Sequence, residues 1–277
     1  MDNGKAIVVT FGNFKGGTGK TTNSTLLAYE LAEQGKKVLL CDQDPQANAT
    51  SLYLKTKELV SGEIHSFNKT LMTAIKEEDL TQIVTEIKEN LYLLPSFSDF
   101  ALYPRFLERK FGASLKDRVQ YFSELLEPLR SEFDYIFIDV PPTISDITDS
   151  ALYASDFVVV VLQTHERSLQ GAEGFTTYLQ SLIDDYDAHL DIVGILPVLL
   201  KNGAPVDMAT LDSAREIFGS ENLFENVVTN MERLKRFDIT GITDDDMHDR
   251  RVHHTYKKIA VEFEKRLAKE LAIQEEV

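Results

Sequence analysis

Apolar residues along the chain follow two patterns. Short runs rich in Val, Ile and Leu contain almost no polar position, as is typical of strands covered on both faces in a parallel sheet. The longer stretches between these runs repeat an apolar residue every three or four positions, which is the period of an amphipathic helix. The first pattern predicts strands at 6–11, 37–42, 91–95, 134–139, 156–162 and 191–199, and the second predicts helices at 20–34, 114–130, 168–186, 207–218 and 256–274.

The order of these elements indicates the fold class. Strands that alternate with helices form βαβ units, whose right-handed crossovers place helices on both faces of a parallel sheet. The 277 residues, 43% of them hydrophobic, are enough for one large core, and no long linker or low-complexity segment divides them. We therefore predict an α/β fold, a three-layer domain with a mostly parallel central sheet, formed as a single unit by residues 1–277.

A glycine-rich stretch, KGGTGKTT at 15–22, lies between the first predicted strand and the first predicted helix, which is where phosphate-binding loops occur. Glycines let backbone N–H groups approach phosphate oxygens, and the helix adds the positive end of its dipole. Lys20 is placed to reach the β- and γ-phosphates, and Thr21 to coordinate Mg²⁺. The alternative, a glycine-rich turn with an incidental lysine, is disfavoured by the flanking strand and helix. The loop residues expected to bind nucleotide are Gly16, Gly17, Thr18, Gly19, Lys20, Thr21 and Thr22.

The loop departs from the common G-x-x-x-x-G-K-[ST] pattern at one position, because Phe14 stands where the first glycine is expected. The resulting K-G-G-x-G-K-T loop resembles the deviant Walker A motif of the ParA/MinD family of P-loop ATPases. The resemblance implies that Lys15 reaches across a dimer interface to the phosphates of the partner's nucleotide and takes part in catalysis. A charge supplied in this way would couple ATP binding to dimerisation. Otherwise Lys15 is a solvated surface lysine.

A second motif, CDQDPQANATSL at 41–52, begins at the end of the predicted strand 37–42. It resembles the D-x-D-P-Q-x-N-[AS]-T segment of the same family, and open α/β sheets bind ligands at such strand ends. The resemblance implies that Asp44 orients or activates the attacking water and that Asp42 supports the Mg²⁺ shell or the loop. The alternative is that an Asp-Pro turn ends the strand and caps the next helix, and for Asp42 that structural role stays equally open.

A third motif, FDYIFIDVPPT at 133–143, is an apolar run that ends in Asp139. It resembles a Walker B strand, whose aspartate holds Mg²⁺, and the D-x-P-P arrangement again resembles the ParA/MinD family. Pro141 and Pro142 stiffen a loop that could sense the γ-phosphate. The expected cofactors are therefore ATP and Mg²⁺, and the expected metal-site residues are Thr21, Asp42 and Asp139.

The C-terminal part of the chain carries the predicted adenine and DNA contacts. The segment 224–243 resembles the loop in which ParA proteins place adenine contacts, here Asn230 and Met231, with DNA-binding basic residues nearby. The formal net charge of −16 opposes DNA binding, and the acidic run DDDMHD at 244–249 lies between two basic clusters. Charge gathered on one face, and doubled in a dimer, would reduce that objection but not remove it, because of this acidic run. Otherwise the basic clusters are solvated surface charges. The residues expected to bind DNA are Arg233, Lys235, Arg236, Arg250 and Arg251.

The resemblance as a whole implies an ATP-dependent DNA-partition (segregation) protein. In ParA-type proteins, ATP-bound homodimers bind DNA non-specifically, and a centromere-binding partition protein stimulates slow hydrolysis that resets the cycle. The loop begins at residue 15, so we expect no helix-turn-helix domain ahead of it. We expect a cytoplasmic protein, associated with the nucleoid when ATP is bound, because the sequence shows no signal peptide and no long apolar stretch. Whether assembly goes beyond a dimer stays open.

Two other classes of protein have related phosphate loops. A membrane-associated positioning ATPase of the MinD type carries a C-terminal amphipathic helix with a basic polar face, whereas residues 256–274 mix Lys, Arg and Glu and the chain ends in EEV. We therefore expect no membrane partner. The other class is a metabolic P-loop enzyme, such as a synthetase or an iron–sulfur reductase. The single cysteine, Cys41, argues against the reductase, and the close match of 41–52 to ParA argues against the synthetase.

Overall fold

The computed structural model describes residues 4–64, 66–199 and 201–276. Its centre is an eight-stranded sheet in the order β3-β4-β2-β5-β1-β6-β7-β8. Neighbouring strands run parallel, except that β3 and β4 are antiparallel. The strands are β1 (Ile7–Gly12), β2 (Val38–Asp42), β3 (Thr85–Lys88), β4 (Leu91–Leu94), β5 (Tyr135–Asp139), β6 (Phe157–Gln163), β7 (Asp191–Leu199) and β8 (Val228–Thr229).

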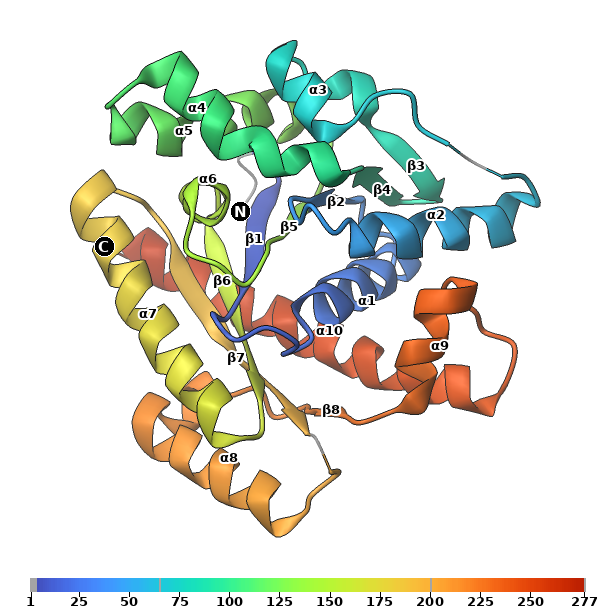
Figure 1. The fold of residues 1–277 in the computed structure, drawn as a ribbon. Helices are drawn as coiled ribbons and strands as arrows, with labels where there is room; N and C mark the ends of the chain where they lie inside the picture. The colour runs from blue at the N-terminus through green and yellow to red at the C-terminus, as the bar shows by residue number, and fades with distance from the viewer. Residues whose placement is uncertain (1–3, 65, 200, 277) are drawn as a thin grey trace.

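Helices cover both faces of this sheet (Figure 1). One face packs against α1, α2, α9 and α10, in a core that includes Phe11, Phe137 and Phe263. The other face packs against α3 to α8, in clusters around Phe100 and Phe175. The helices are α1 (Lys20–Glu33), α2 (Asn48–Ser61), α3 (Leu71–Lys76), α4 (Tyr103–Phe111), α5 (Leu115–Leu126), α6 (Asp146–Tyr153), α7 (Glu166–Tyr186), α8 (Pro205–Phe218), α9 (Glu232–Thr240) and α10 (Met247–Glu276).

The predicted fold class, a three-layer α/β domain with a mostly parallel sheet, is confirmed. Each of the six predicted strands is present within one residue of its expected bounds. The predicted final helix is wrong at its start, because α10 begins at Met247 and not at 256. The sequence did not predict β3, since this edge strand buries only Ile87 and has no apolar run, and it did not predict the two-residue β8 or the helices α2, α3, α4, α6 and α9.

The sheet order brings the three sequence motifs to one edge. β1 lies between β5 and β6, so the strand order reverses beside it, and ligands bind outside the carboxyl ends of strands at such a point. The register of the parallel strands sets Asp139 of β5 beside Phe11 of β1 and beside Asp42 of β2. The loops that follow β1, β2 and β5 therefore meet at the same edge of the sheet.

Candidate nucleotide-binding site

The phosphate loop leaves β1 at Gly12 and enters α1 at Lys20. Gly17 and Gly19 have φ angles of 74° and 94°, in the left-handed region that other residues rarely adopt. Gly16 and Gly17 are exposed, and Gly19 is the N-cap of α1. The unpaired N–H groups of the first helical turn therefore face the loop, and this arrangement binds anions.

Lys20 lies across this loop and not in solvent. The residue is 7% exposed, and its Nζ donates to the carbonyl oxygen of Asn13 at 3.1 Å. Burial lowers the pKa of Lys20, while the charges of Asp139 and Asp44 oppose that effect. The ammonium is therefore held at the mouth of the loop, where phosphate oxygens could accept its remaining hydrogen bonds.

The first turn of α1 carries the predicted magnesium ligand. The Thr21 hydroxyl donates to Asp139 Oδ2 at 2.7 Å, and the Ser24 hydroxyl donates to Asp139 Oδ1 at 3.4 Å. Thr22 is half-buried, and Thr18 is buried with a hydroxyl that has no hydrogen-bond partner among the described residues. Thr21 and Asp139, from two different motifs, are thus in direct contact.

Asp139 and Asp42 form a fully buried pair of carboxyl groups. Burial raises the pKa of both groups, the charge of Asp42 raises that of Asp139 further, and the Thr21 hydroxyl lowers it. A cation beside the two carboxyl groups would offset the free-energy cost of burying their negative charges. Carboxylate oxygens are also ligands that suit Mg²⁺. Among the described residues, no three His, Cys, Asp or Glu side chains could hold a metal ion by themselves. Phosphate oxygens and water would complete the coordination, as is usual for Mg²⁺ at nucleotides.

Asp42 accepts three hydrogen bonds from the loop between β2 and α2. Its Oδ1 accepts from the Asp44 N–H at 3.0 Å, and its Oδ2 accepts from the Thr50 N–H at 2.9 Å and the Thr50 hydroxyl at 2.8 Å. These bonds tie the end of β2 to the first turn of α2. They favour the loop-holding role of Asp42, and a direct part in the metal shell stays a prediction.

Asp44 is half-buried at the same edge of the sheet. Its Oδ1 accepts from the N–H of Gln46 at 2.9 Å. Its charge acts on both Lys20 and Asp139, so the carboxylate lies near the predicted phosphate-binding lysine and near the predicted metal site. The position suits a group that orients water, and the catalytic role itself stays a prediction.

The entrance of the loop is fixed to α7. Phe14 packs edge-on against Phe175 and Tyr178, with ring centroids 5.2 and 5.3 Å apart. Asn13 donates from Nδ2 to a carbonyl of β6 at 2.9 Å, and its Oδ1 accepts from the N–H of Lys15 at 2.8 Å. Phe14, which breaks the ordinary motif, therefore anchors the loop. Asn13 is a site residue that the sequence did not reveal, since its only signal was a polar residue two positions before the motif.

Lys15 follows this anchored stretch. A Cβ added at Gly171 of α7 would lie 3.4 Å from the Lys15 Cβ, so helix and loop are in close contact here. Lys15 is half-buried, and none of the ion pairs between described residues includes its ammonium. The contact of Lys15 with a partner's nucleotide stays a prediction.

The two predicted adenine contacts differ in exposure. Asn230 is exposed, and its N–H donates to Asn202 Oδ1 at 2.6 Å. Met231 is buried and belongs to the hydrophobic core on the α1 face of the sheet. Its side chain is therefore occupied in packing, and of the two residues only Asn230 is exposed.

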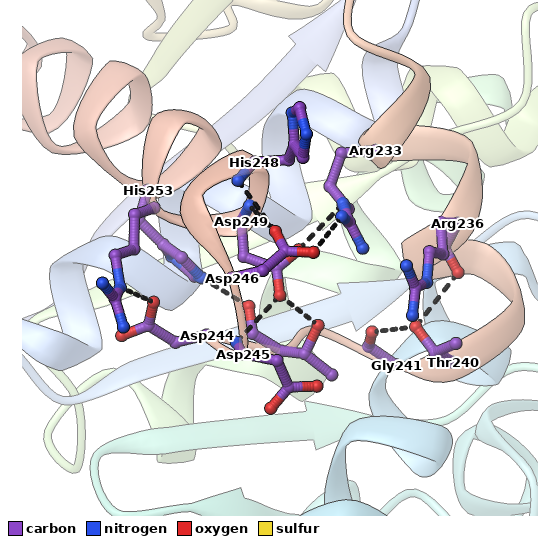
Figure 2. A network of polar contacts seen from close by, with 12 residues as sticks. Arg233, Arg236, Thr240, Gly241, Asp244, Asp245, Asp246, His248, Asp249 and His253 are labelled. Carbon is purple, nitrogen blue, oxygen red and sulfur yellow. Dashed lines mark hydrogen bonds and ion pairs between the residues drawn. The ribbon is translucent and has the colours of Figure 1, made fainter.

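The five basic residues predicted to contact DNA fall into two groups. The side chain of Arg233 is 10% exposed, and its guanidinium pairs with Asp246 and, at 3.0 Å, with Asp249 (Figure 2). Arg233 therefore joins α9 to the start of α10. Two carboxylates already pair with its charge, so it is poorly placed to bind a phosphate. The other four, Lys235, Arg236, Arg250 and Arg251, are exposed.

Two of these exposed residues have acidic neighbours. Lys235 Nζ lies 3.2 Å from Glu232, and Arg250 Nε lies 3.5 Å from Asp244. Solvent-exposed pairs of this kind contribute about 0–1 kcal/mol each, so a phosphate could replace the carboxylate at little cost. The acidic run 244–249 thus engages Arg233 firmly and Arg250 only weakly.

His253 lies in the same network (Figure 2), and its contact with Glu30 links that network to α1. Its Nδ1 lies 2.5 Å from Glu30 Oε1 and its Nε2 lies 2.9 Å from the Thr243 carbonyl. Burial alone would lower the pKa of His253, but these two hydrogen bonds and the charges of Glu30 and Asp244 outweigh it and raise the pKa. The charged imidazolium is therefore favoured in the folded protein.

This raised pKa predicts a pH-dependent contribution to stability. A His with a raised folded-state pKa stabilises fully below its unfolded pKa of about 6.5, and the contribution is lost as pH rises through the folded-state value. We expect His253→Gln to lower the free energy of unfolding by about 1–3 kcal/mol at pH 5.5 and by less at pH 8.5, measured by urea titration. His248→Gln, an exposed control, should change neither value. A loss that is the same at both pH values would contradict this account of His253.

Comparison with known proteins places this site in a family. The family model described as an AAA domain matches residues 6–192. The chromosome-partitioning ATPase Soj of Thermus thermophilus is 31% identical over 228 residues, which are 82% of this chain and 82% of that protein. The chain therefore belongs to the AAA-domain family of P-loop ATPases. Within it, the chain is a member of the ParA/MinD group, as its loop predicts.

Solved structures share the fold across a wider range of activities. The ATP complex of a McdA variant from Cyanothece superposes with a TM-score of 0.78 at 19% identity, over 95% of this chain and 97% of that chain. Cobyrinic acid a,c-diamide synthase from Mycobacterium smegmatis, with bound ADP and magnesium, gives 0.69 at 22% identity, over 92% of each chain. Because a synthase has this fold as well, the fold alone does not separate partition from biosynthesis. None of the described helices is long and apolar enough to cross a membrane.

Proposed function

We propose that this protein is a DNA-partition ATPase that ATP switches into a DNA-binding dimer. The observation that carries the proposal is the loop entrance. Lys15 is fixed there against α7, and its ammonium forms no ion pair with a described residue, while Lys20 already serves the same loop. The name of the Thermus thermophilus relative, a chromosome-partitioning ATPase, supports the same function.

In this proposal the loop N–H groups and Lys20 bind the β- and γ-phosphates of ATP. The chain at Asn230 and Met231 lies at the adenine, with Met231 held by its core packing and Asn230 exposed. Thr21 and Asp139 hold Mg²⁺, and Asp42 supports them by fixing the loop. Mg²⁺, when bound, neutralises charge on the phosphates. Asp44 orients the attacking water, a task that dominates catalysis in NTP hydrolysis. The described contacts among Thr21, Asp139 and Asp42 support this division of roles.

The proposed dimer places a second copy of the chain over the edge of the sheet that carries the loop. Lys15 then reaches the phosphates of the partner's nucleotide, so the interface is complete only with ATP. Exposed apolar side chains at the same edge support this arrangement, since Phe97 follows the end of β4 and Ile144 follows the end of β5. A second chain at this edge would remove both apolar side chains from water.

The proposed DNA contacts lie on α9 and at the start of α10. Lys235, Arg236, Arg250 and Arg251 present their charges to solvent, whereas Arg233 would act mainly by holding α9 against α10. A chain of net charge −16 can bind a polyanion only through such a local surface, and a dimer doubles it. A centromere-binding partition protein would stimulate slow hydrolysis and so release the DNA.

A DNA titration under three nucleotide conditions tests the proposal. We expect binding of non-specific duplex DNA with ATP and Mg²⁺, and binding at least about 10-fold weaker with ADP or without nucleotide. Removing two phosphate contacts with Arg250→Ala/Arg251→Ala should weaken binding and reduce the slope of log affinity against log salt by about two. Arg105→Ala/Arg109→Ala, which removes the same charge from α4, is the control.

The outcomes of this titration distinguish a DNA-partition ATPase from a membrane-positioning ATPase. DNA binding that ignores the nucleotide would contradict the switch, and equal losses in the two double variants would contradict the assigned surface. ATP-dependent sedimentation with anionic vesicles in place of DNA would indicate a membrane-positioning ATPase. Against that class, Ile259, Ala260 and Phe263 of α10 are fully buried in the core, so this apolar face is packed against protein.

A further inference from the structure

The last helix places a buried hydroxyl beside the phosphate loop. Tyr256 of α10 is 0% exposed, and its hydroxyl donates to Oδ1 of Asn23 at 3.0 Å. Asn23 lies at the start of α1 and is 1% exposed. The two residues are 233 positions apart in the sequence, and α10 lies beside α1 on the same face of the sheet (Figure 1).

Asn23 also contacts the phosphate loop directly. Its Nδ2 donates to the carbonyl oxygen of Gly19 at 2.7 Å, and its backbone N–H donates to the same oxygen at 2.9 Å. The Gly19 carbonyl can only accept, so the amide nitrogen of Asn23 faces it and the amide oxygen faces Tyr256. The Tyr256 hydroxyl must then be the donor. The two side chains and the carbonyl form one chain of hydrogen bonds with a fixed direction.

The orientation of a peptide group follows from these bonds. In a planar trans peptide the carbonyl of Gly19 and the N–H of Lys20 point in opposite directions. Two donors hold this carbonyl toward α1, so the Lys20 N–H points into the loop, where phosphate oxygens bind. Gly19 has a φ of 94°, in a region that glycine adopts without steric cost, and the Asn23 side chain adds a second donor to the backbone bond that holds its carbonyl.

We propose that Asn23 and Tyr256 are positioning residues for nucleotide binding, which fix the Gly19–Lys20 peptide so that its N–H faces the phosphates. The inference rests on the proposed function to the extent that the loop must bind a nucleotide. It goes beyond that function because it assigns a role at the loop to α10, the helix that also carries Arg250 and Arg251.

Tyr256→Phe tests the proposal, because it removes the hydroxyl and keeps the ring. Tyr53→Phe is a matched control, since Tyr53 is also fully buried and its hydroxyl donates to the backbone of α1, at the Thr25 carbonyl at 2.7 Å, away from the loop. We expect the Kd of a fluorescent ATP analogue to rise about 3- to 10-fold in Tyr256→Phe and to stay within about twofold in Tyr53→Phe. Both variants should show similar decreases in Tm, measured without nucleotide.

A double-mutant cycle tests whether the Tyr256 hydroxyl affects nucleotide binding through Asn23. Asn23→Ala should raise the Kd at least as much as Tyr256→Phe, and adding Tyr256→Phe to Asn23→Ala should raise it no further. Equal changes of Kd in the two Tyr variants, no change in either, or additive losses in the cycle would overturn the positioning role. A wild-type protein that binds no nucleotide would overturn the proposed function, and this role with it.

Discussion

Lys15→Ala is expected to bind ATP within about threefold of the wild-type affinity and to lose ATP-dependent dimerisation. Removing one member of a charge pair at an interface costs about 2–5 kcal/mol, so the dimer should weaken by at least about 30-fold. Because a charge supplied in trans contributes about 10³- to 10⁵-fold to phosphoryl transfer, hydrolysis should fall by about 10³-fold. Sedimentation velocity with ATP, ADP and no nucleotide measures the first effect, and phosphate release measures the second.

Lys20→Ala is the control for this experiment, since the two lysines occupy the same loop but only Lys20 bends back over it, onto the Asn13 carbonyl. Its loss should abolish nucleotide binding itself, and dimerisation fails as a consequence. The two variants therefore lose the dimer for different reasons, which the binding measurement separates. A Lys15→Ala protein that dimerises and hydrolyses ATP at the wild-type rate would remove Lys15 from the mechanism.

Asp44→Asn is expected to reduce ATP hydrolysis by about 10²- to 10³-fold while ATP binding and dimerisation persist. The amide has the size of the carboxylate and can still accept the hydrogen bond from the Gln46 N–H, so the turn is kept and only the capacity to orient and polarise water is lost. Single-turnover phosphate release measures the change. We expect ATP-bound dimers to last correspondingly longer in sedimentation.

The substitution also separates the two roles considered for Asp44. If the carboxylate serves only the Asp-Pro turn, the asparagine variant should hydrolyse ATP at the wild-type rate, and Asp44→Ala alone should fail. A wild-type rate of hydrolysis in Asp44→Asn would therefore assign the water-orienting task to another group. Asp42 is less suitable for this test, because Asp42→Asn leaves three donors from the loop facing an amide that can satisfy only part of them.

The sequence predicted the strand before the glycine-rich loop and the helix after it because their signals are local. Gly16 to Thr22 are consecutive, and the strand before them is a continuous apolar run. Asp139 could be assigned to the site because the apolar strand that it ends follows the phosphate loop along the chain and is itself followed by Pro141 and Pro142. The edge strand β3 gave no such signal, because a strand at the edge of a sheet can be polar at most positions, and here only Ile87 is buried.

Contacts between distant segments account for what the sequence could not show. Arg233 belongs to a basic cluster on α9, yet the fold turns its guanidinium onto Asp246 and Asp249, so a residue predicted at the surface is largely buried. The link from Tyr256 to Asn23 spans nearly the whole chain. Neither residue belongs to a motif, and only the packing of α10 on α1 brings them together.

The packing of Phe14 on α7 would have a kinetic consequence for the proposed dimer. A flexible lysine at an interface must be ordered when two proteins meet, and that ordering slows or weakens association. Here the aromatic contacts with Phe175 and Tyr178 hold the backbone before Lys15 in place in a single chain. The rate of dimer formation should then follow the concentration of ATP-loaded chains, with no separate delay for folding of the loop. In the proposed function, dimer formation would then respond to ATP loading without delay, as a cycle timed by slow hydrolysis would require.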